Sequence, residues 1–280
     1  MPDAEPEWEQ VITACADGVL TYRLRAWSLF SDFLEREVFD RHQGDRREFI
    51  WRGQRRDVWP LSTSLDRLLD SMGLLDRSER QLERWAREHL ERFKYAARGR
   101  RGAAAPALEE VEWWALGQHY GLATPLLDWS HSPYAAAYFA FDAVGADPTP
   151  TRVVWALDRR AVVRFNTVMD RGESFEVGRM PVLAFIEPLS DENPRLVSQG
   201  GLFTRGPIGT PVEAWVRDAF AGSSEPILLR IEIPDSDRIA CLRTLARMNI
   251  SHLTLFPDLG GASHHVNRLF ELAPLLPPAA

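Results

Sequence analysis

The sequence is poor in lysine and has no long hydrophobic run. Lys94 is the only lysine among 33 basic residues, a bias that we attribute to GC-rich coding, so arginine abundance alone says little about function. The longest unbroken apolar run, Ala135 to Phe141, is far shorter than the roughly 20 residues that span a bilayer. The acidic start, Met1 to Gln10, lacks the charged and apolar regions of a signal peptide. We therefore expect a cytoplasmic protein with no membrane partner.

Cysteine is equally scarce. Cys15 and Cys241 lie in separate helical patterns without the spacing of a disulfide or a zinc site, which suits a reducing compartment. His119 and His131 are separated by a glycine turn and a strand, with no further ligand at a usual interval. We expect no bound metal.

Composition indicates a soluble globular chain with a substantial core. The 280 residues, 45% of them hydrophobic, suffice for one large domain or two small ones. The net charge of -7 gives no overall attraction to nucleic acid, so such a partner would need a local patch. Arg98, Arg100 and Arg101 form one candidate in a stretch with the glycine and alanine of a mobile loop, and a solvated helix end is the plainer alternative.

The pattern of elements predicts one α+β domain with a small mixed or antiparallel β core surrounded by helices. Helical spacing predicts helical structure over residues 8–40. Residues 1–26 form a helical lead-in, the main domain covers 27–273, and a frayed tail covers 274–280. We expect helices over residues 78–99, 106–120, 132–141, 160–170, 211–220 and 235–249, and a last helix opened by Asp258. Strands are expected at 49–51, 152–158, 182–187, 195–204 and 227–234.

Arg52 is the most informative residue, because it follows the apolar strand Phe49 to Trp51 and precedes Gly53. We expect it at the end of that strand, facing a cleft, with the glycine allowing a sharp turn or a close approach to a ligand. A planar guanidinium there suits a phosphate or a carboxylate. The alternative is a structural tie to a loop carboxylate.

A second group of polar residues follows a glycine-terminated helix. Residues 106–120 deliver Gln118, His119 and Tyr120 to the last helical turn, and residues 122–129 are extended. Ser132 then caps a new, very apolar helix that has Pro133 at its first position. The N-terminus of such a buried helix favours an anion.

Four motifs in order carry a resemblance to a known family. They are FIWRGQ at 49–54, HYGLATPLLDWSHSPYAAAYFA at 119–140, RLVSQGGLFT at 195–204 and LFPDLG at 255–260. Together they resemble the FRG domain, a family named for its aromatic-Arg-Gly motif, here Trp51 to Gly53. The resemblance runs from Trp27 to Leu269 and implies one domain of that kind.

A further similarity, to ADP-ribosyltransferases, implies a chemistry. Those enzymes also have a strand with aromatic-Arg-Gly and a later strand that leads into a helix, so the similarity implies a β core of their type with NAD as substrate. Arg52 would brace the NAD phosphates and ribose. A hydroxyl motif that shapes the nicotinamide ribose pocket would correspond here to Thr124, Asp128, Trp129, Ser130 and Ser132. Ser62 to Ser64 spell a similar motif, but we expect a helix cap there.

The late strand of this sequence departs from that pattern. Where those transferases place a glutamate, Gln199 offers hydrogen bonds to a ribose but no negative charge. Asp128, between Leu127 and Trp129, could be a desolvated general base with a raised pKa, or an acid paired with Arg52. Asp258 is expected to cap a helix.

Two hypotheses follow. The first is an NAD-consuming ADP-ribosyltransferase or NAD glycohydrolase, with a nucleic-acid or protein acceptor, a bacterial toxin or antiphage role, and an inhibitory antitoxin partner. Its catalytic residues would be Arg52, Asp128 and Gln199. Its NAD-binding residues would be Arg52, Gln54, His119, Tyr120, Thr124, Trp129 and Ser132, with Tyr120 and Trp129 sandwiching nicotinamide or a base. The second hypothesis is a module that binds a nucleotide or nucleic acid in the same cleft without chemistry.

Overall fold

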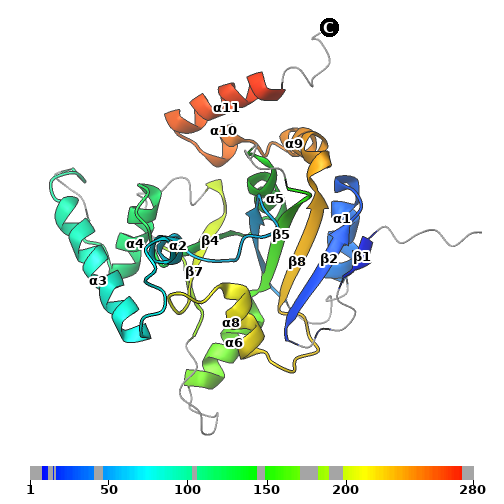
Figure 1. Cartoon of the computed structure of the whole chain (residues 1–280). Helices are drawn as coiled ribbons and strands as arrows, with labels where there is room; N and C mark the ends of the chain where they lie inside the picture. Colours follow the sequence, from blue (N-terminus) through cyan, green and yellow to red (C-terminus); the bar gives the residue numbers. More distant parts are fainter. Residues whose placement is uncertain are drawn as a thin grey trace, which may run out of the picture.

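A mixed, mostly antiparallel sheet forms the centre of the molecule (Figure 1). The computed structural model describes residues 8–11, 15, 17–40, 47–102, 106–143, 149–170, 182–188 and 198–272. The eight strands of this part of the chain lie in the order β1-β2-β8-β5-β3-β4-β7-β6, and only β2 and β8 are parallel. Their bounds are β1 Trp8–Gln10, β2 Val19–Leu24, β3 Phe49–Gln54, β4 Leu127–Ser130, β5 Thr151–Asp158, β6 Ala184–Ile186, β7 Gly201–Arg205 and β8 Leu228–Pro234. The predicted α+β class is confirmed.

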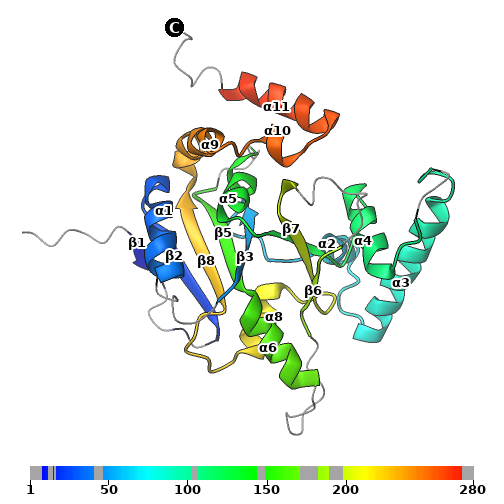
Figure 2. The same ribbon diagram turned by 180° about the vertical axis from the view of Figure 1, so that it is seen from behind.

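Helices cover both faces of the sheet and one of its ends. α1 (Phe30–Phe33), α5 (Pro133–Phe141) and α9 (Arg238–Arg247) share a buried apolar cluster with one face. α6 (Arg159–Asp170) and α8 (Val212–Ala219) pack against the other. α2 (Ser64–Ser71), α3 (Glu79–Ala96) and α4 (Glu110–His119) form a third cluster with Leu126, Ile186 and Phe203, beside β6 and β7 (Figure 2). Short helical turns occupy Trp27–Leu29, Leu34–Phe39 and Asp235–Asp237, and α10 (His252–Leu255) and α11 (Leu259–Leu272) follow α9.

The predicted helical lead-in is wrong in its first part. Strands β1 and β2 lie where helix was expected, and helical structure begins only at Trp27. In β2 five of six residues are buried, and the strand pairs along its length with β8. Pairing with a distant strand therefore outweighs the local helical pattern, which periodicity alone could not show. Residues 1–7 and the tail 273–280 lie outside the described residues.

Two strand boundaries also differ from the prediction. The expected strand at 195–204 begins only at Gly201, after a turn at Gln199 and Gly200, and residues 195–197 lie outside the described part. Arg52 is not at the end of its strand either, because β3 continues through Gly53 to Gln54 and pairs with β5 throughout.

Gly53 is needed for helix packing rather than for a turn. A Cβ atom at this position would lie 1.8 Å from the carbonyl oxygen of Ala136 and 2.6 Å from the amide nitrogen of Ala140. Both atoms belong to the backbone of α5, so no side chain can move aside to relieve the contact. The glycine thus lets α5 lie directly on β3.

We predict that Gly53→Ala lowers the free energy of unfolding by about 3 kcal/mol, the upper end of the usual range for overpacking. Chemical denaturation measures this loss in the free energy of unfolding. Gly206→Ala is the control, because its Cβ would meet only the side-chain tip of Leu183 at 3.1 Å, and it should cost less than about 1 kcal/mol. Equal losses in the two variants would contradict the close approach of α5 to β3.

The α10 and α11 segment is tied to the end of α5 through Asp142. The Asp142 carboxylate accepts hydrogen bonds from the Tyr138 hydroxyl (2.8 Å) and from Arg268 Nε (3.1 Å) and Nη2 (3.2 Å). His252 Nδ1 lies 3.9 Å from the same carboxylate, and the ring stacks on Phe256 with 4.2 Å between centroids. Burial lowers the pKa of His252, and the negative charge of Asp142 opposes that shift.

The lowered pKa predicts a loss of stability in mild acid. As the pH falls below about 6.5, the unfolded chain binds a proton at His252 that the folded chain resists, so the folded state loses stability down to the lowered pKa. Denaturation of His252→Phe should show a smaller change in unfolding free energy between about pH 7.5 and pH 5.5 than the wild type. The same change at exposed His131 should leave the wild-type difference intact. An unaltered difference in His252→Phe would contradict the assignment.

Candidate functional site

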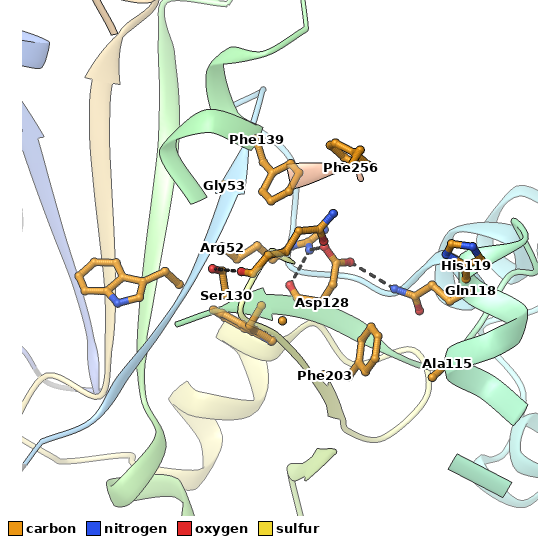
Figure 3. A pocket seen from close by; sticks show the side chains of 14 residues that line it. Arg52, Gly53, Ala115, Gln118, His119, Asp128, Ser130, Phe139, Phe203 and Phe256 are labelled. Carbon is orange, nitrogen blue, oxygen red and sulfur yellow. Dashed lines mark hydrogen bonds and ion pairs between the residues drawn. The ribbon is translucent and has the colours of Figure 1, made fainter. Parts of the chain in front are cut away.

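The candidate site lies where β3 and β4 separate. β3 pairs with β5 over all six residues, but with β4 only through Trp51 and Ser130. Beyond that pair a cavity of about 280 Å³ opens. It is lined by Trp51, Arg52, Gly53, Ala115, Gln118, His119, Asp128, Trp129, Ser130, Phe139, Gln199, Gly201, Phe203 and Phe256 (Figure 3). The motifs far apart in the sequence therefore meet here.

Arg52 bridges the gap between the two strands. Its Nη1 donates to the main-chain carbonyl of Asp128 at 2.7 Å and lies 2.7 Å from the carboxylate oxygen Oδ2 of the same residue. The side chain is only 17% exposed. Its Nε is buried and has no hydrogen-bond acceptor among the described residues. Nη1 is thus used for structure, whereas Nη2 has no acceptor among the described residues and remains as a donor for a ligand.

Asp128 is a paired acid rather than a desolvated base. Its side chain is 59% exposed, because residues alternate along β4 and Asp128 faces away from buried Leu127 and Trp129. Gln118 Nε2 donates to its Oδ1 at 3.4 Å. The expected desolvation is absent, and the alternative of an ion pair with Arg52 is confirmed.

Gln199 reaches the cavity from a turn. Ser130 Oγ donates to the Gln199 carbonyl at 2.6 Å, and the His131 amide donates to the Gly200 carbonyl at 2.9 Å. The side-chain Nε2 of Gln199 donates to the carbonyl of Leu255, the last residue of α10, at 3.1 Å. These bonds fix the turn between β4 and α10, and they hold the amide at the cavity wall.

Aromatic side chains complete the walls. In Figure 3, Phe139 and Phe256 lie on one side of the Arg52–Asp128 pair and Phe203 lies on the other, with His119 and Gln118 reaching in from α4. The rings of Phe139 and Phe256 meet edge to face at 6.0 Å. The sequence reasoning missed all three phenylalanines as site residues. All three lie inside the quoted motifs, which was the available signal.

Tyr120 and Trp129, expected to sandwich nicotinamide, do not face each other across this cavity. Tyr120 is 73% exposed and does not line it. Trp129 does line it, but the indole is buried and its Nε1 donates to Thr204 Oγ1 at 2.9 Å. The predicted sandwich of Tyr120 and Trp129 is therefore wrong, because α4 ends with Tyr120 turned to solvent.

Three further predicted residues have structural partners. Thr124 is fully buried, and its Oγ1 donates to Gln118 Oε1 at 2.5 Å. Ser132 caps α5 by accepting from the Ala135 amide, as expected. Gln54 donates to the Pro60 carbonyl and accepts from Trp155 Nε1. These side chains support the site without lining this cavity.

The arginine patch after α3 is a helix end. Arg98 Nε donates to the Tyr95 carbonyl at 3.2 Å, and Arg100 Nη1 donates to the Ala96 carbonyl at 2.6 Å. Arg101 Nη2 donates to the Pro106 carbonyl at 2.8 Å. None of the three lines the cavity at Arg52. The geometry therefore favours the plainer alternative, a solvated helix end.

Both predicted helix caps are confirmed. Thr63 and Asp66 form a reciprocal capping box at the start of α2, so Ser62 to Ser64 are not a ribose motif. Asp258 Oδ1 accepts from the Gly261 amide at 2.7 Å at the start of α11. Among the described residues that line the cavity, Asp128 is the only carboxylate.

Comparison with known families matches the central segment of the chain. Residues 47–147 match the FRG domain, which supports the FRG family for the segment from β3 through α5. This segment holds Arg52, His119 and Asp128, whereas Gln199 and Phe256 lie beyond it. Comparisons with curated proteins and with solved structures found no match. Within the described residues, no helix is long and apolar enough to cross a bilayer.

The bridge between β3 and β4 predicts unequal effects on stability. Arg52→Ala leaves the Asp128 carbonyl without its donor and should lower the free energy of unfolding by about 2 kcal/mol. Asp128→Asn keeps that carbonyl and removes only a half-exposed ion pair, which is worth less than about 1 kcal/mol. Denaturant titrations compare the two variants. A larger loss in Asp128→Asn would contradict a bridging role for Arg52.

Proposed function

We propose that the cavity between β3 and β4 binds NAD and cleaves the bond between nicotinamide and ribose. One observation carries the proposal. Arg52, Asp128 and Gln199, which are far apart in the sequence, converge on one cavity with aromatic walls. A guanidinium, a carboxylate and an amide on such walls suit a ligand that has phosphate, a developing positive charge and ribose hydroxyls.

Each group has a role that its geometry permits. Nη2 of Arg52, which has no acceptor among the described residues, is the donor for a phosphate oxygen. Asp128 places the only negative charge of the described lining beside the reacting ribose, which compensates for the missing glutamate. Gln199 donates to Leu255 through Nε2, so its side-chain oxygen Oε1 is the atom left to accept from a ribose hydroxyl.

The reaction follows from the charge on the bound nicotinamide. The glycosidic bond breaks with both electrons going to the ring nitrogen, so nicotinamide leaves as a neutral base and positive charge develops on the ribose. The oxygen of water or a nucleophile of an acceptor then bonds to the ribose carbon. His119, which also lines the cavity, accepts the released proton.

The proposal also covers the acceptor of the ADP-ribose group and the biological role of the reaction. Nucleic acid and protein are both candidate acceptors, and hydrolysis needs neither. Loss of NAD harms the cell that makes the enzyme, so a toxin or antiphage role with an inhibitory antitoxin partner fits the ADP-ribosyltransferase similarity.

A second candidate function is nucleotide binding without cleavage. The pairing of Asp128 supports this function, because Arg52 offsets its charge and Gln118 donates to its other carboxylate oxygen. A carboxylate neutralised in this way gives less stabilisation to a developing cation. A module of this kind would hold the nucleotide in the same cavity and release it unchanged.

Nicotinamide release separates the two functions. Purified protein is incubated with NAD, with and without mixed protein and nucleic-acid acceptors, and released nicotinamide is measured by chromatography. We expect release by wild type, and a loss of about 100-fold or more in Arg52→Ala and Asp128→Asn. Arg84→Ala, on the exposed side of α3, is the control and should match wild type.

Two outcomes would decide against cleavage. Release by wild type no greater than by Arg52→Ala in every acceptor mixture would contradict the enzyme. If calorimetry then shows NAD binding that Arg52→Ala abolishes, the binding module is the function.

A further inference from the structure

A second cavity adjoins the first at Arg52. Its volume is about 730 Å³, and it shares Arg52, Gly53 and Phe139 with the cavity that holds Asp128. The loop after β3 and the start of α2 supply most of its remaining walls. The first cavity, at about 280 Å³, is slightly smaller than pockets that hold a drug-sized ligand, which take about 300 to 1,000 Å³. A dinucleotide bound there therefore has to extend into a neighbouring space.

Three arginines line the second cavity. Arg55 and Arg67 join Arg52 in its walls, and neither forms an ion pair with a carboxylate of the described residues. Partial burial and the neighbouring positive charge of Arg52 lower the pKa of Arg67. The negative charges of Asp128 and Asp66 oppose this shift, so the like charges are compensated only in part, an arrangement that a bound anion relieves further.

The arginine donors are only partly used. Arg67 Nη1 donates to the Ser62 carbonyl at 2.7 Å. The Nε atoms of Arg52 and Arg55 are buried without an acceptor in the described part of the chain. The Arg55 guanidinium lies over the Trp59 ring, 5.1 Å from its centroid. Arg52 and Arg67 each use only Nη1 in hydrogen bonds within the described residues, so their Nη2 atoms remain as donors for phosphate oxygens near the aromatic surface of Trp59.

The acidic residues of this cavity compensate the arginines only in part. Asp66 accepts from the Thr63 amide at 2.9 Å and from the Gly209 amide at 2.7 Å, so both of its oxygens serve structure. Asp70, like Arg67, occupies an exposed position of α2, where solvent screens its charge. The carboxylate partner of Arg52, Asp128, belongs to the first cavity.

The loop that carries Arg55 and Trp59 is held in place. Asp57 accepts from the Thr149 and Thr151 hydroxyls, each at 3.2 Å, and its carbonyl accepts from Arg230 Nη2 at 2.8 Å. Gln54 Nε2 donates to the Pro60 carbonyl at 2.9 Å. Gln54 therefore has a structural role, because this hydrogen bond holds the loop. A fixed loop lowers the entropic cost of ordering Arg55 and Trp59 around a ligand.

We infer that the second cavity is a site for a nucleoside 5′-phosphate. The phosphate lies among Arg52, Arg55 and Arg67, and the base lies against Trp59, whose side chain is 39% exposed. This inference rests on the proposed function in one respect. It assigns the adenylate half of NAD to the second cavity and the nicotinamide half to the first, with Arg52 at the junction.

Calorimetric titration with AMP tests the site directly. We expect AMP to bind wild type, adenosine to bind at least tenfold more weakly, and inorganic pyrophosphate to compete with AMP. Arg55→Gln, Arg67→Gln and Trp59→Ala should each weaken AMP binding at least tenfold. Arg84→Gln, on α3, is the matched control and should bind AMP like wild type. Thermal unfolding of each variant verifies that it is folded.

The results distinguish this site from the proposed reaction. AMP binding that depends on Arg55 and Arg67, without any nicotinamide release, keeps the site and removes the enzyme. Nicotinamide release with a KM for NAD that Arg55→Gln and Arg67→Gln leave unchanged keeps the enzyme and overturns the site. Absence of AMP binding at millimolar concentration, or equal binding by folded variants and wild type, also overturns it.

Discussion

The contact between the Arg52 guanidinium and residue 128 of β4 is the interaction on which the site depends. A sheet normally satisfies its strand edges by a continuous ladder of backbone hydrogen bonds. Here the ladder between β3 and β4 is reduced to one pair of residues, and a long side chain supplies the donor that the missing backbone would have given. The two strands can diverge because of this bridge, and a cavity forms inside the sheet. A complete ladder would leave no such space.

The three residues of the aromatic-Arg-Gly motif have three different surroundings. Trp51 is buried in the cluster beneath α5, Arg52 lies between the two cavities, and Gly53 lets the backbone of α5 approach β3. The close approach of α5 matters for the site, since Phe139 on this helix lines both cavities. One tripeptide therefore contributes a buried core residue, supplies the positive charge of the site and determines how close the helix that carries Phe139 lies to the sheet. This accounts in physical terms for the motif as a unit.

The elements with a strong local signal could be predicted from the sequence. The serine-capped, uniformly apolar helix after Pro133 and the apolar strand before Asp158 are found where their patterns place them. The pairing of Arg52 with Asp128 was one of two alternatives that the residues left open. β2 could not be predicted, since it is a strand only because it pairs with β8, about 200 positions away. The outward orientation of Tyr120 and the loop that carries Arg55 and Trp59 likewise depend on tertiary contacts that periodicity does not encode.

The two functions considered for the chain share one requirement, a phosphate at Arg52, and differ in what happens afterwards. A crystal structure of the wild-type protein with ADP-ribose tests that requirement most directly. The account predicts a phosphate oxygen within hydrogen-bond distance of Arg52, the adenine against Trp59 and the terminal ribose facing Asp128 and Gln199. ADP-ribose bound elsewhere on the molecule, or no ordered ligand at saturating concentration with Arg52 still joined only to Asp128, would contradict it.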